Sequence, residues 1–267
     1  MSIEGSITAL VTPMKETGDL DFNALENLIN FQIESGIKGL VAVGTTGESA
    51  TIDIEDHIKI IEFFVKKANG KVSVIAGTGA NSTHEAIHLT NAAKDVGASA
   101  ALLVSPYYNK PPQEGIYQHH MKIADSVDIP QILYNVPSRT ASFIESPTVA
   151  KLASHENIIG IKDATGDLDN LKDLKRLCRL KIEAGEFFLF SGDDFSSFEF
   201  MKNGGHGTIS VTSNVAPKIV SDICELISTD LSKAEELDKS LTELNASLFL
   251  ESNPIPVKWA LYKMGII

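Results

Sequence analysis

The sequence has few cysteines and few basic residues, and each shortage excludes or disfavours some classes of protein. Its two cysteines, Cys178 and Cys224, form no CxxC pair, which leaves one disulfide or two free thiols, and free thiols in a reducing compartment are the better interpretation. Lys and Arg number 23 against 35 Asp and Glu, a net charge of -12 that argues against nucleic-acid binding, which depends on basic patches. A small anionic substrate stays open, because a site can be locally positive in an acidic protein.

Long apolar runs are also missing. Residues 1–14 lack a basic region and a long apolar core, so they do not resemble a signal peptide. No apolar run approaches the roughly 18 residues that a membrane helix needs. We therefore expect a soluble protein, located in the cytoplasm, with no membrane partner.

The sequence does contain a regular alternation of short β-branched runs and helical patterns. Eight runs are predicted to be strands: 6–13, 39–44, 72–77, 99–106, 130–137, 157–163, 186–192 and 207–210. The segments between them place apolar residues at helical spacing and several end on glycine, as 22–36 does at Gly36. Strands that alternate with helices are parallel, because each crossover returns the chain to the same edge of the sheet.

These elements predict a (β/α)8 TIM barrel with an added C-terminal helical region. The chain has 267 residues, 43% of them hydrophobic, and one such barrel takes roughly 250 residues. After 207–210 the strand signals stop and the spacing becomes helical. We therefore expect the barrel over 1–213 and helices packed on it over 214–267, without an independent second folding unit.

Two motif matches are better explained by structure than by chemistry. HEAIH at 84–88 fits a zinc pattern, but its histidines share the polar face of a helix and no third ligand is evident, so a solvent-facing helix is the better interpretation. GTGANS at 77–82 has Ser82 where a dinucleotide fingerprint needs its third glycine, which favours a tight strand-to-helix turn.

Polar and reactive residues gather after the predicted strands, at the end where a (β/α)8 barrel has its active site. They follow six of the eight strands: Thr45, Thr46, Tyr107, Tyr108, Tyr134, Arg139, Lys162, Gly192, Asp193, Ile209 and Ser210. Ordinary loop polarity would explain any one of these residues. It is the poorer explanation for the whole set.

Lys162 ends a nearly all-apolar strand, which is an unusual place for a charged side chain. A nucleophilic amine must be neutral, and removal from water inside an apolar barrel favours the neutral form of lysine. We therefore predict that Lys162 forms a Schiff base with a carbonyl substrate. An ion pair with Asp163 is the alternative, which strand alternation weakens because neighbouring residues point to opposite sides.

Three further features lie near the predicted lysine. Tyr134, on the neighbouring strand, either moves protons to and from a lysine-bound intermediate or packs as an aromatic side chain. The GTTG turn with Thr45 and Thr46 offers backbone N–H groups and two hydroxyls, which suit a carboxylate. It is not a P-loop, because Glu48 stands where a lysine is required. Arg139 either holds a second carboxylate or forms a surface salt bridge.

The motifs around these residues resemble those of the dihydrodipicolinate synthase family, Schiff-base class I aldolases with a (β/α)8 barrel and C-terminal helices. They occur in the family's order over essentially the whole chain: GTTGES, SPYYNKP, YNVPSRT, GIKDAT, SGDD, GHGTISVTSN and NPIPVKWA. The resemblance implies that Lys162 forms an imine with pyruvate. It also implies a proton relay of Thr45, Tyr134 and Tyr108, in which Tyr108 reaches in from a second subunit.

The same resemblance implies the substrates and the assembly. Thr45 and Thr46 would hold the pyruvate carboxylate, Gly192 and Ile209 would lend backbone groups, and Arg139 would hold L-aspartate 4-semialdehyde. The product would be 4-hydroxy-tetrahydrodipicolinate, at the entry to diaminopimelate and lysine biosynthesis. No metal or organic cofactor is expected, because the lysine imine is itself the electron sink. The usual assembly is a homotetramer built as a dimer of dimers.

Two other activities stay open. N-acetylneuraminate lyases and 2-keto-3-deoxy sugar-acid aldolases share the lysine and tyrosine, but they usually differ at the positions of Thr46 and Arg139, which here favour the synthase. A barrel that binds pyruvate without catalysis is disfavoured by the intact set of Lys162, Tyr134 and Thr45.

The resemblance also implies a regulatory site for free L-lysine, at a dimer interface and away from the active site. The matching positions are Ser49, Ala50, His57, Asn81, Glu85 and Tyr107. Glu85 and Asn81 suit the ammonium groups of lysine, and Tyr107 suits its carboxylate, although interface packing is the alternative. Ile54 stands where some sensitive members have histidine, so we expect partial inhibition.

Overall fold

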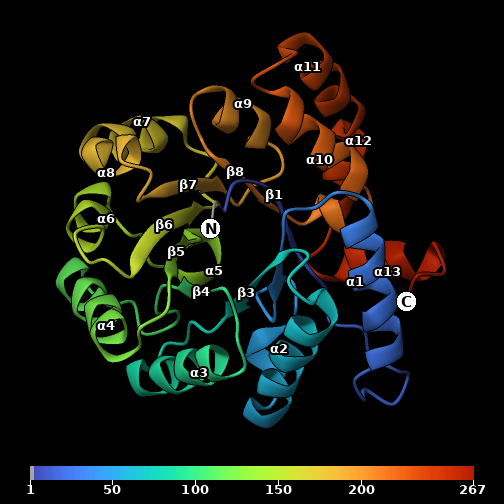
Figure 1. Ribbon diagram of the computed structural model, residues 1–267, viewed down its shortest axis with the longest axis horizontal. Helices are drawn as coiled ribbons and strands as arrows, with labels where there is room; N and C mark the ends of the chain where they lie inside the picture. Colours follow the sequence, from blue (N-terminus) through green and yellow to red (C-terminus); the bar gives the residue numbers. More distant parts are fainter. Residues whose placement is uncertain (1–2) are drawn as a thin grey trace.

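Eight parallel strands close into a barrel in chain order, with the last strand paired to the first (Figure 1). The computed structural model describes residues 3–267. The strands are β1 (Gly5–Ala9), β2 (Gly39–Ala42), β3 (Ser73–Gly77), β4 (Ala100–Val104), β5 (Gln131–Asn135), β6 (Ile158–Asp163), β7 (Phe188–Ser191) and β8 (Gly207–Ser210). All eight predicted strands and the (β/α)8 fold class are confirmed. Most observed strands are shorter than predicted, because apolar residues continue into the loops at the strand ends.

Helices follow the strands, and most of them form the outer ring, whereas the short α5 lies inside it at the end of the barrel (Figure 1). Those of the barrel are α1 (Phe22–Glu34), α2 (Ile54–Ala68), α3 (Thr83–Asp95), α4 (Gln113–Ser126), α5 (Pro137–Thr140), α6 (Ser146–Leu152), α7 (Leu168–Leu177), α8 (Arg179–Glu183) and α9 (Ser197–Lys202). After β8 come α10 (Pro217–Leu226), α11 (Leu231–Ser240), α12 (Thr242–Leu248) and α13 (Ile255–Lys263). Two short 3-10 turns are η1 (Ser49–Thr51) and η2 (Thr212–Asn214). None of the helices between residues 3 and 267 is both long and apolar enough to cross a membrane.

Local sequence explains where several helices begin. The Asp21 carboxylate accepts hydrogen bonds from the backbone N–H groups of Asn23 and Ala24, and so caps α1. Ser82, which replaces the third glycine of the dinucleotide fingerprint, caps α3 because its side chain accepts a hydrogen bond from the N–H of Glu85. Each such cap stabilises its helix by about 1 kcal/mol, because it satisfies N–H groups that have no partner inside the helix.

The barrel interior is filled with apolar side chains, so the barrel is a packed core and not a channel. They come from most of the strands: Ile7, Val41, Ile75, Leu102, Ile132, Tyr134, Phe190 and Ile209. A second cluster joins the outer faces of the first strands to α1, α2 and α13. Each fully buried leucine or isoleucine contributes about 1.5–3 kcal/mol by leaving water. The polar site must therefore lie at an open end of the barrel.

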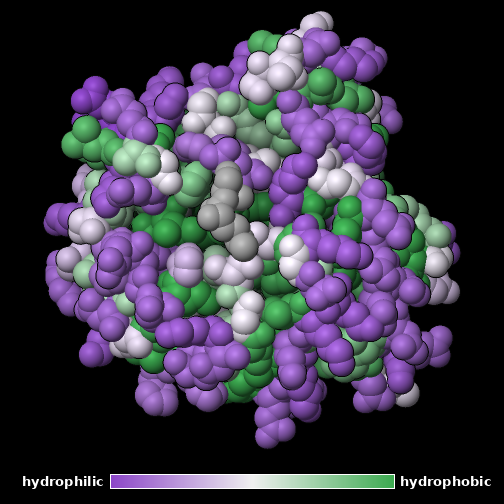
Figure 2. Space-filling view, viewed as in Figure 1, coloured by the Kyte–Doolittle hydropathy of each residue, from purple (hydrophilic) through white to green (hydrophobic). Residues whose placement is uncertain are grey.

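Of the C-terminal helices, α10 packs against β1, and α12 and α13 contact η2, the turn after β8 (Figure 1). The buried carboxylate of Asp194, after β7, accepts hydrogen bonds from the N–H groups of Val211 and Thr212, and its backbone carbonyl accepts one from Asn245 of α12. These bonds join α12 to the ends of β7 and β8. Figure 2 shows mostly hydrophilic residues over the outer helices. Cys178 and Cys224 are both free.

Candidate active site

Lys162 lies at the end of β6 with only 5% of its surface exposed. Its register partner on β5 is Tyr134, and its Nζ atom lies 4.3 Å from the centroid of the Tyr134 ring. Between residues 3 and 267 no carboxylate forms an ion pair with Lys162. The structure therefore brings the predicted nucleophile and the predicted proton carrier into contact, with no counter-ion to hold the amine.

Asp163 points to the opposite side of β6, as the alternation predicts. Its carboxylate accepts hydrogen bonds from Asn170 Nδ2 at 2.8 Å, Thr165 Oγ1 at 2.9 Å and Asn135 Nδ2 at 3.3 Å. Burial raises the pKa of Asp163, and these hydrogen bonds act against that shift. The ion pair between Lys162 and Asp163 is thus the wrong alternative, and Asp163 instead joins β5, β6 and α7 behind the lysine.

Gly192, directly after β7, lies against the aliphatic part of the lysine. A Cβ atom at position 192 would stand 2.7 Å from Lys162 Cε and 2.9 Å from the Cβ of Ala164, well inside van der Waals contact. The Gly192 N–H donates to the carbonyl of Asp163 at 2.7 Å, which continues the pairing between the two strand ends. The absence of a side chain at 192 therefore leaves room for Lys162.

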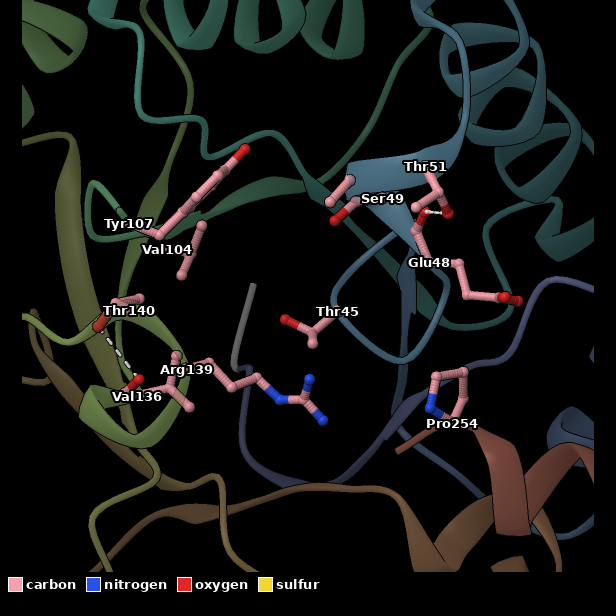
Figure 3. Close-up of a pocket in the computed structure, with 11 residues that line it drawn as sticks. Thr45, Glu48, Ser49, Thr51, Val104, Tyr107, Val136, Arg139, Thr140 and Pro254 are labelled. Carbon is pink, nitrogen blue, oxygen red and sulfur yellow. Dashed lines mark hydrogen bonds between the residues drawn. The ribbon is translucent and has the colours of Figure 1, made fainter. Parts of the chain in front are cut away.

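A cavity of about 380 Å³ opens at this end of the barrel (Figure 3). Its lining comes from the segments that follow several strands: Thr45, Glu48, Ser49, Ala50, Thr51, Val104, Tyr107, Val136, Arg139, Thr140 and Pro254. In Figure 3 the Arg139 side chain extends across the cavity toward Thr45 and Pro254. A smaller cavity of about 20 Å³ shares Thr45 and Val104 with it and is also lined by Tyr134. The wall of the large cavity thus continues to the tyrosine beside Lys162.

The two threonines after β2 have different surroundings. Thr45 lines both cavities, whereas Thr46 is buried and its Oγ1 accepts a hydrogen bond from Asn253 Nδ2 at 2.9 Å. The turn is compact because Gly47 packs on Val43, where an added Cβ would stand 2.9 Å from the Val43 Cα. The Thr45 carbonyl accepts from the N–H of Glu48 and closes the turn.

Arg139 lies on the exposed side of α5 and reaches the cavity. Its Nη2 donates to the backbone carbonyl of Asn253 at 2.9 Å, and within the described chain it forms no ion pair. The surface salt bridge considered from the sequence is therefore wrong for this chain. A guanidinium has five N–H groups, so most of its hydrogen-bonding capacity is left for a carboxylate.

The positions predicted to bind L-lysine do not form a separate site in the single chain. Ser49, Ala50 and Tyr107 line the same cavity as Thr45 and Arg139, because the β2 turn that carries Thr45 runs directly into η1. The predicted site lies at a dimer interface, so a site for L-lysine away from the active site stays a prediction.

The other three positions of that set lie around Tyr107 and at the end of β3. Asn81 Nδ2 donates to the backbone carbonyl of Tyr107 at 3.3 Å, and burial together with the charge of Glu85 raises the Tyr107 pKa. The His57 ring is buried and its Nε2 lies 2.7 Å from the carbonyl oxygen of Gly77. Burial lowers the His57 pKa, which indicates a neutral ring held by packing.

Several predicted residues are not brought to the cavity by this chain alone. Tyr108 is 89% exposed and has a φ of 74°, so its side chain stands out from the surface. The Asp193 carboxylate accepts hydrogen bonds from the N–H and the hydroxyl of Ser196, just before α9, and Ser210 accepts from the N–H of Ser213. Ile209 is a buried residue of β8 in the barrel core.

The zinc pattern is confirmed as a solvent-facing helix, since His84 and His88 are exposed on α3. Over residues 3–267 no three His, Cys, Asp or Glu side chains gather in a way that could hold a metal ion. Asn253, which contacts both Thr46 and Arg139, was not predicted as a site residue. Its only signal in the sequence is its place in the NPIPVKWA motif.

Comparison with known proteins agrees with this geometry. The model of the dihydrodipicolinate synthetase family matches residues 2–267. The chain is 53% identical over 266 residues to the 4-hydroxy-tetrahydrodipicolinate synthase of Methylococcus capsulatus, an alignment that covers 99% of this chain and 90% of the relative. The pyruvate complex of the Acinetobacter baumannii dihydrodipicolinate synthase, described as chloride inhibited, is 50% identical. It superposes with a TM-score of 0.95 over 99% of this chain and 90% of that one.

A more distant structure has the same fold. The synthase of Cyanidioschyzon merolae with lysine bound is 37% identical and has a TM-score of 0.93, over 98% of this chain and 89% of that one. Full-length matches to the family model and to relatives at this identity confirm the resemblance found in the motifs. The chain belongs to the dihydrodipicolinate synthetase family.

Proposed function

We propose that the chain is a 4-hydroxy-tetrahydrodipicolinate synthase, a lyase that condenses pyruvate with L-aspartate 4-semialdehyde. The observation that carries this proposal is a buried lysine without a counter-ion, in contact with Tyr134 at the end of the barrel where the cavity opens. Relatives at about half sequence identity have this name, and the related Acinetobacter structure contains pyruvate.

The first step joins Lys162 to pyruvate. The neutral Nζ adds to the keto carbon, the carbonyl oxygen leaves as water, and an imine forms. The positive imine withdraws electrons from the neighbouring methyl group, which loses a proton to give an enamine. Tyr134 lies within reach of Lys162 and, with Thr45 and a Tyr108 from a second subunit, moves these protons. The imine is the electron sink, so this step needs no metal or organic cofactor.

The second step forms the carbon–carbon bond. The enamine carbon attacks the aldehyde of L-aspartate 4-semialdehyde, and the aldehyde oxygen takes a proton and becomes a hydroxyl group. The amine of the new chain then attacks the imine carbon and displaces Lys162, which closes the ring. Arg139, with one N–H donated to a carbonyl and the others free, binds the carboxylate of the aldehyde substrate.

Thr45 and Thr46 bind the pyruvate carboxylate, while Gly192 and Ile209 lend backbone groups to the same substrate. Two observations support these roles: Thr45 lines the cavity, and Gly192 lies against Lys162. Thr46 follows Thr45 in the same turn and is buried, and because its Oγ1 accepts from Asn253 it keeps a hydroxyl proton for the carboxylate. A homotetramer built as a dimer of dimers would supply the exposed Tyr108 to a neighbouring subunit.

L-Lysine is proposed as a partial inhibitor that binds around Tyr107, Glu85 and Asn81. Asn81 contacts the backbone of Tyr107, and Glu85 is close enough for its charge to act on the phenol. The Cyanidioschyzon relative has lysine bound. Ile54 is 43% exposed at the start of α2 and offers no polar group there.

One assay tests the proposed activity against its nearest rival. The purified chain is mixed with pyruvate and aspartate semialdehyde in one arm and with N-acetylneuraminate in the other. We expect product only in the first arm. Cleavage of the sugar acid with no condensation would show that the chain is a lyase of the related kind.

A further inference from the structure

One residue contacts two of the three side chains that are proposed to hold substrate carboxylates, Thr46 and Arg139. Asn253, between α12 and α13, is 8% exposed, and its Nδ2 donates to Thr46 Oγ1 at 2.9 Å across 207 residues of sequence. Its backbone carbonyl accepts from Arg139 Nη2 at 2.9 Å across 114 residues. The segment before α13 therefore reaches the barrel end and joins two parts of the proposed site.

The direction of the Asn253 to Thr46 bond determines what Thr46 can do. A threonine hydroxyl has one proton to donate and lone pairs that accept. When the Asn253 amide donates to the oxygen, the hydroxyl proton is left free to donate to another group. A carboxylate is an acceptor, so this direction prepares Thr46 to bind one.

The burial of the amide favours this direction over the reverse. Asn253 Oδ1 is buried and has no hydrogen-bond partner within residues 3–267. If the amide were turned over, its NH2 group would be the buried part without an acceptor, and Thr46 would give its proton to Oδ1. Buried N–H groups without partners are rarer in proteins than underused carbonyl oxygens, which makes the reverse arrangement the less stable one.

We propose that Asn253 is a positioning residue for pyruvate, which orients the Thr46 hydroxyl so that its proton points to the pyruvate carboxylate. This inference rests on the proposed function, because it takes Thr46 as a carboxylate ligand. It adds a residue outside the strand ends and gives the NPIPVKWA segment a role in binding. The two contacts of Asn253 use different atoms, so changes of its side chain affect Thr46 and leave the backbone contact to Arg139 in place.

Three variants test the orientation. In Asn253→Asp the carboxylate can only accept hydrogen bonds, so the Thr46 hydroxyl donates to it and no longer to pyruvate. The new negative charge also repels the pyruvate carboxylate. Asn253→Ala removes the donor, and Thr46→Val removes the hydroxyl at similar volume. Ser252→Ala is the matched control, since Ser252 is exposed in the same segment and its side chain makes no hydrogen bond in the described chain.

The readout is imine formation on Lys162, trapped with borohydride at increasing pyruvate and without the aldehyde. We expect the half-saturating pyruvate concentration to rise about tenfold or more in Asn253→Asp, the range for a hydrogen bond to a charged group, and about threefold to tenfold in Asn253→Ala. The KM for aspartate semialdehyde should stay within about twofold, because Arg139 keeps its contact. Asn253→Ala should add no further effect to Thr46→Val, since the two act through one hydroxyl.

Melting temperatures of all variants show whether each one folds. Asn253→Asp has the same size as the wild type, so it supplies the test if the alanine variant unfolds. If the wild type traps pyruvate on Lys162 but Asn253→Asp keeps its pyruvate dependence, the inference is wrong and the proposed function stands. Equal losses for both substrates would show a merely structural role for Asn253 and would also overturn it. If the wild type traps no pyruvate on Lys162, the proposed function fails and this inference fails with it.

Discussion

Gly192→Ala tests how closely the barrel holds the nucleophile. The new Cβ would stand 2.7 Å from Lys162 Cε, 2.9 Å from Ala164 Cβ and 3.0 Å from Lys162 Cγ. Carbon atoms pack at about 3.5–4.0 Å, so one of these groups must move by about 1 Å. The lysine end is the more flexible group, and its movement displaces Nζ from Tyr134.

The size of the effect follows from these contacts. Overpacking of this kind costs about 1–3 kcal/mol of the free energy of unfolding. A displacement of about 1 Å at a reacting group costs about 100-fold in rate. We therefore expect a folded Gly192→Ala enzyme whose imine formation, followed by borohydride trapping at saturating pyruvate, is about 100-fold slower.

A second variant separates the steric clash with Ala164 from the steric clash with Lys162. Ala164→Gly removes the atom that lies 2.9 Å from the added methyl group but leaves the contact with Lys162. The double variant Ala164→Gly with Gly192→Ala should recover part of the lost stability in urea unfolding while its imine formation stays slow. Wild-type rates in Gly192→Ala, or rates that recover along with stability, would refute the reasoning that Gly192 acts through Lys162.

Three further predictions concern other parts of the chain. Arg139→Ala should lower kcat/KM for aspartate semialdehyde by an amount equivalent to roughly 2–5 kcal/mol while pyruvate trapping is retained, and unchanged kinetics would remove Arg139 from the site. L-Lysine should inhibit the wild type modestly, with a coupling free energy between lysine binding and substrate binding of about 1–3 kcal/mol. Glu85→Ala should weaken this inhibition without changing the uninhibited rate, and calorimetry that detects no lysine binding to the wild type would contradict this. Burial lowers the pKa of His120 from 6.5 to about 3, so as the pH falls the unfolded chain binds a proton at this histidine before the folded chain does. The folded state is therefore most stable above pH 6.5 with respect to this group, and it loses that stability as the pH falls. In urea unfolding, His120 should lower the free energy of unfolding by about 2 kcal/mol between pH 6.5 and pH 5. A His120→Phe variant whose free energy of unfolding has the same pH dependence as that of the wild type would disprove this assignment.

Much of the fold and the centre of the site could be predicted because they depend on local patterns. Strand period places Lys162 and Asp163 on opposite sides of one strand, and the structure confirms both the contact of Lys162 with Tyr134 and the separate hydrogen bonds of Asp163. The order of the parallel strands then brings residues from neighbouring strand ends together, as it does for Tyr134 on β5 and Lys162 on β6.

The features that escaped prediction depend on long-range packing. The bond from Asn253 to Thr46 joins segments 207 residues apart, and no periodicity within either segment indicates the other. Arg139 was ambiguous for the same reason, because its partner is a backbone carbonyl of that distant segment. The shared cavity of Ser49, Tyr107 and Thr45 likewise depends on how closely the loops after β2 and β4 approach each other.

The most direct test of the central claim is the identity of the lysine that pyruvate modifies. The wild-type chain is incubated with pyruvate and borohydride, digested, and examined by mass spectrometry. Our account predicts one reduced pyruvyl group per chain, on the peptide that contains Lys162, and none in Lys162→Ala. Modification of a different lysine, or of none, in a folded wild-type chain would contradict it.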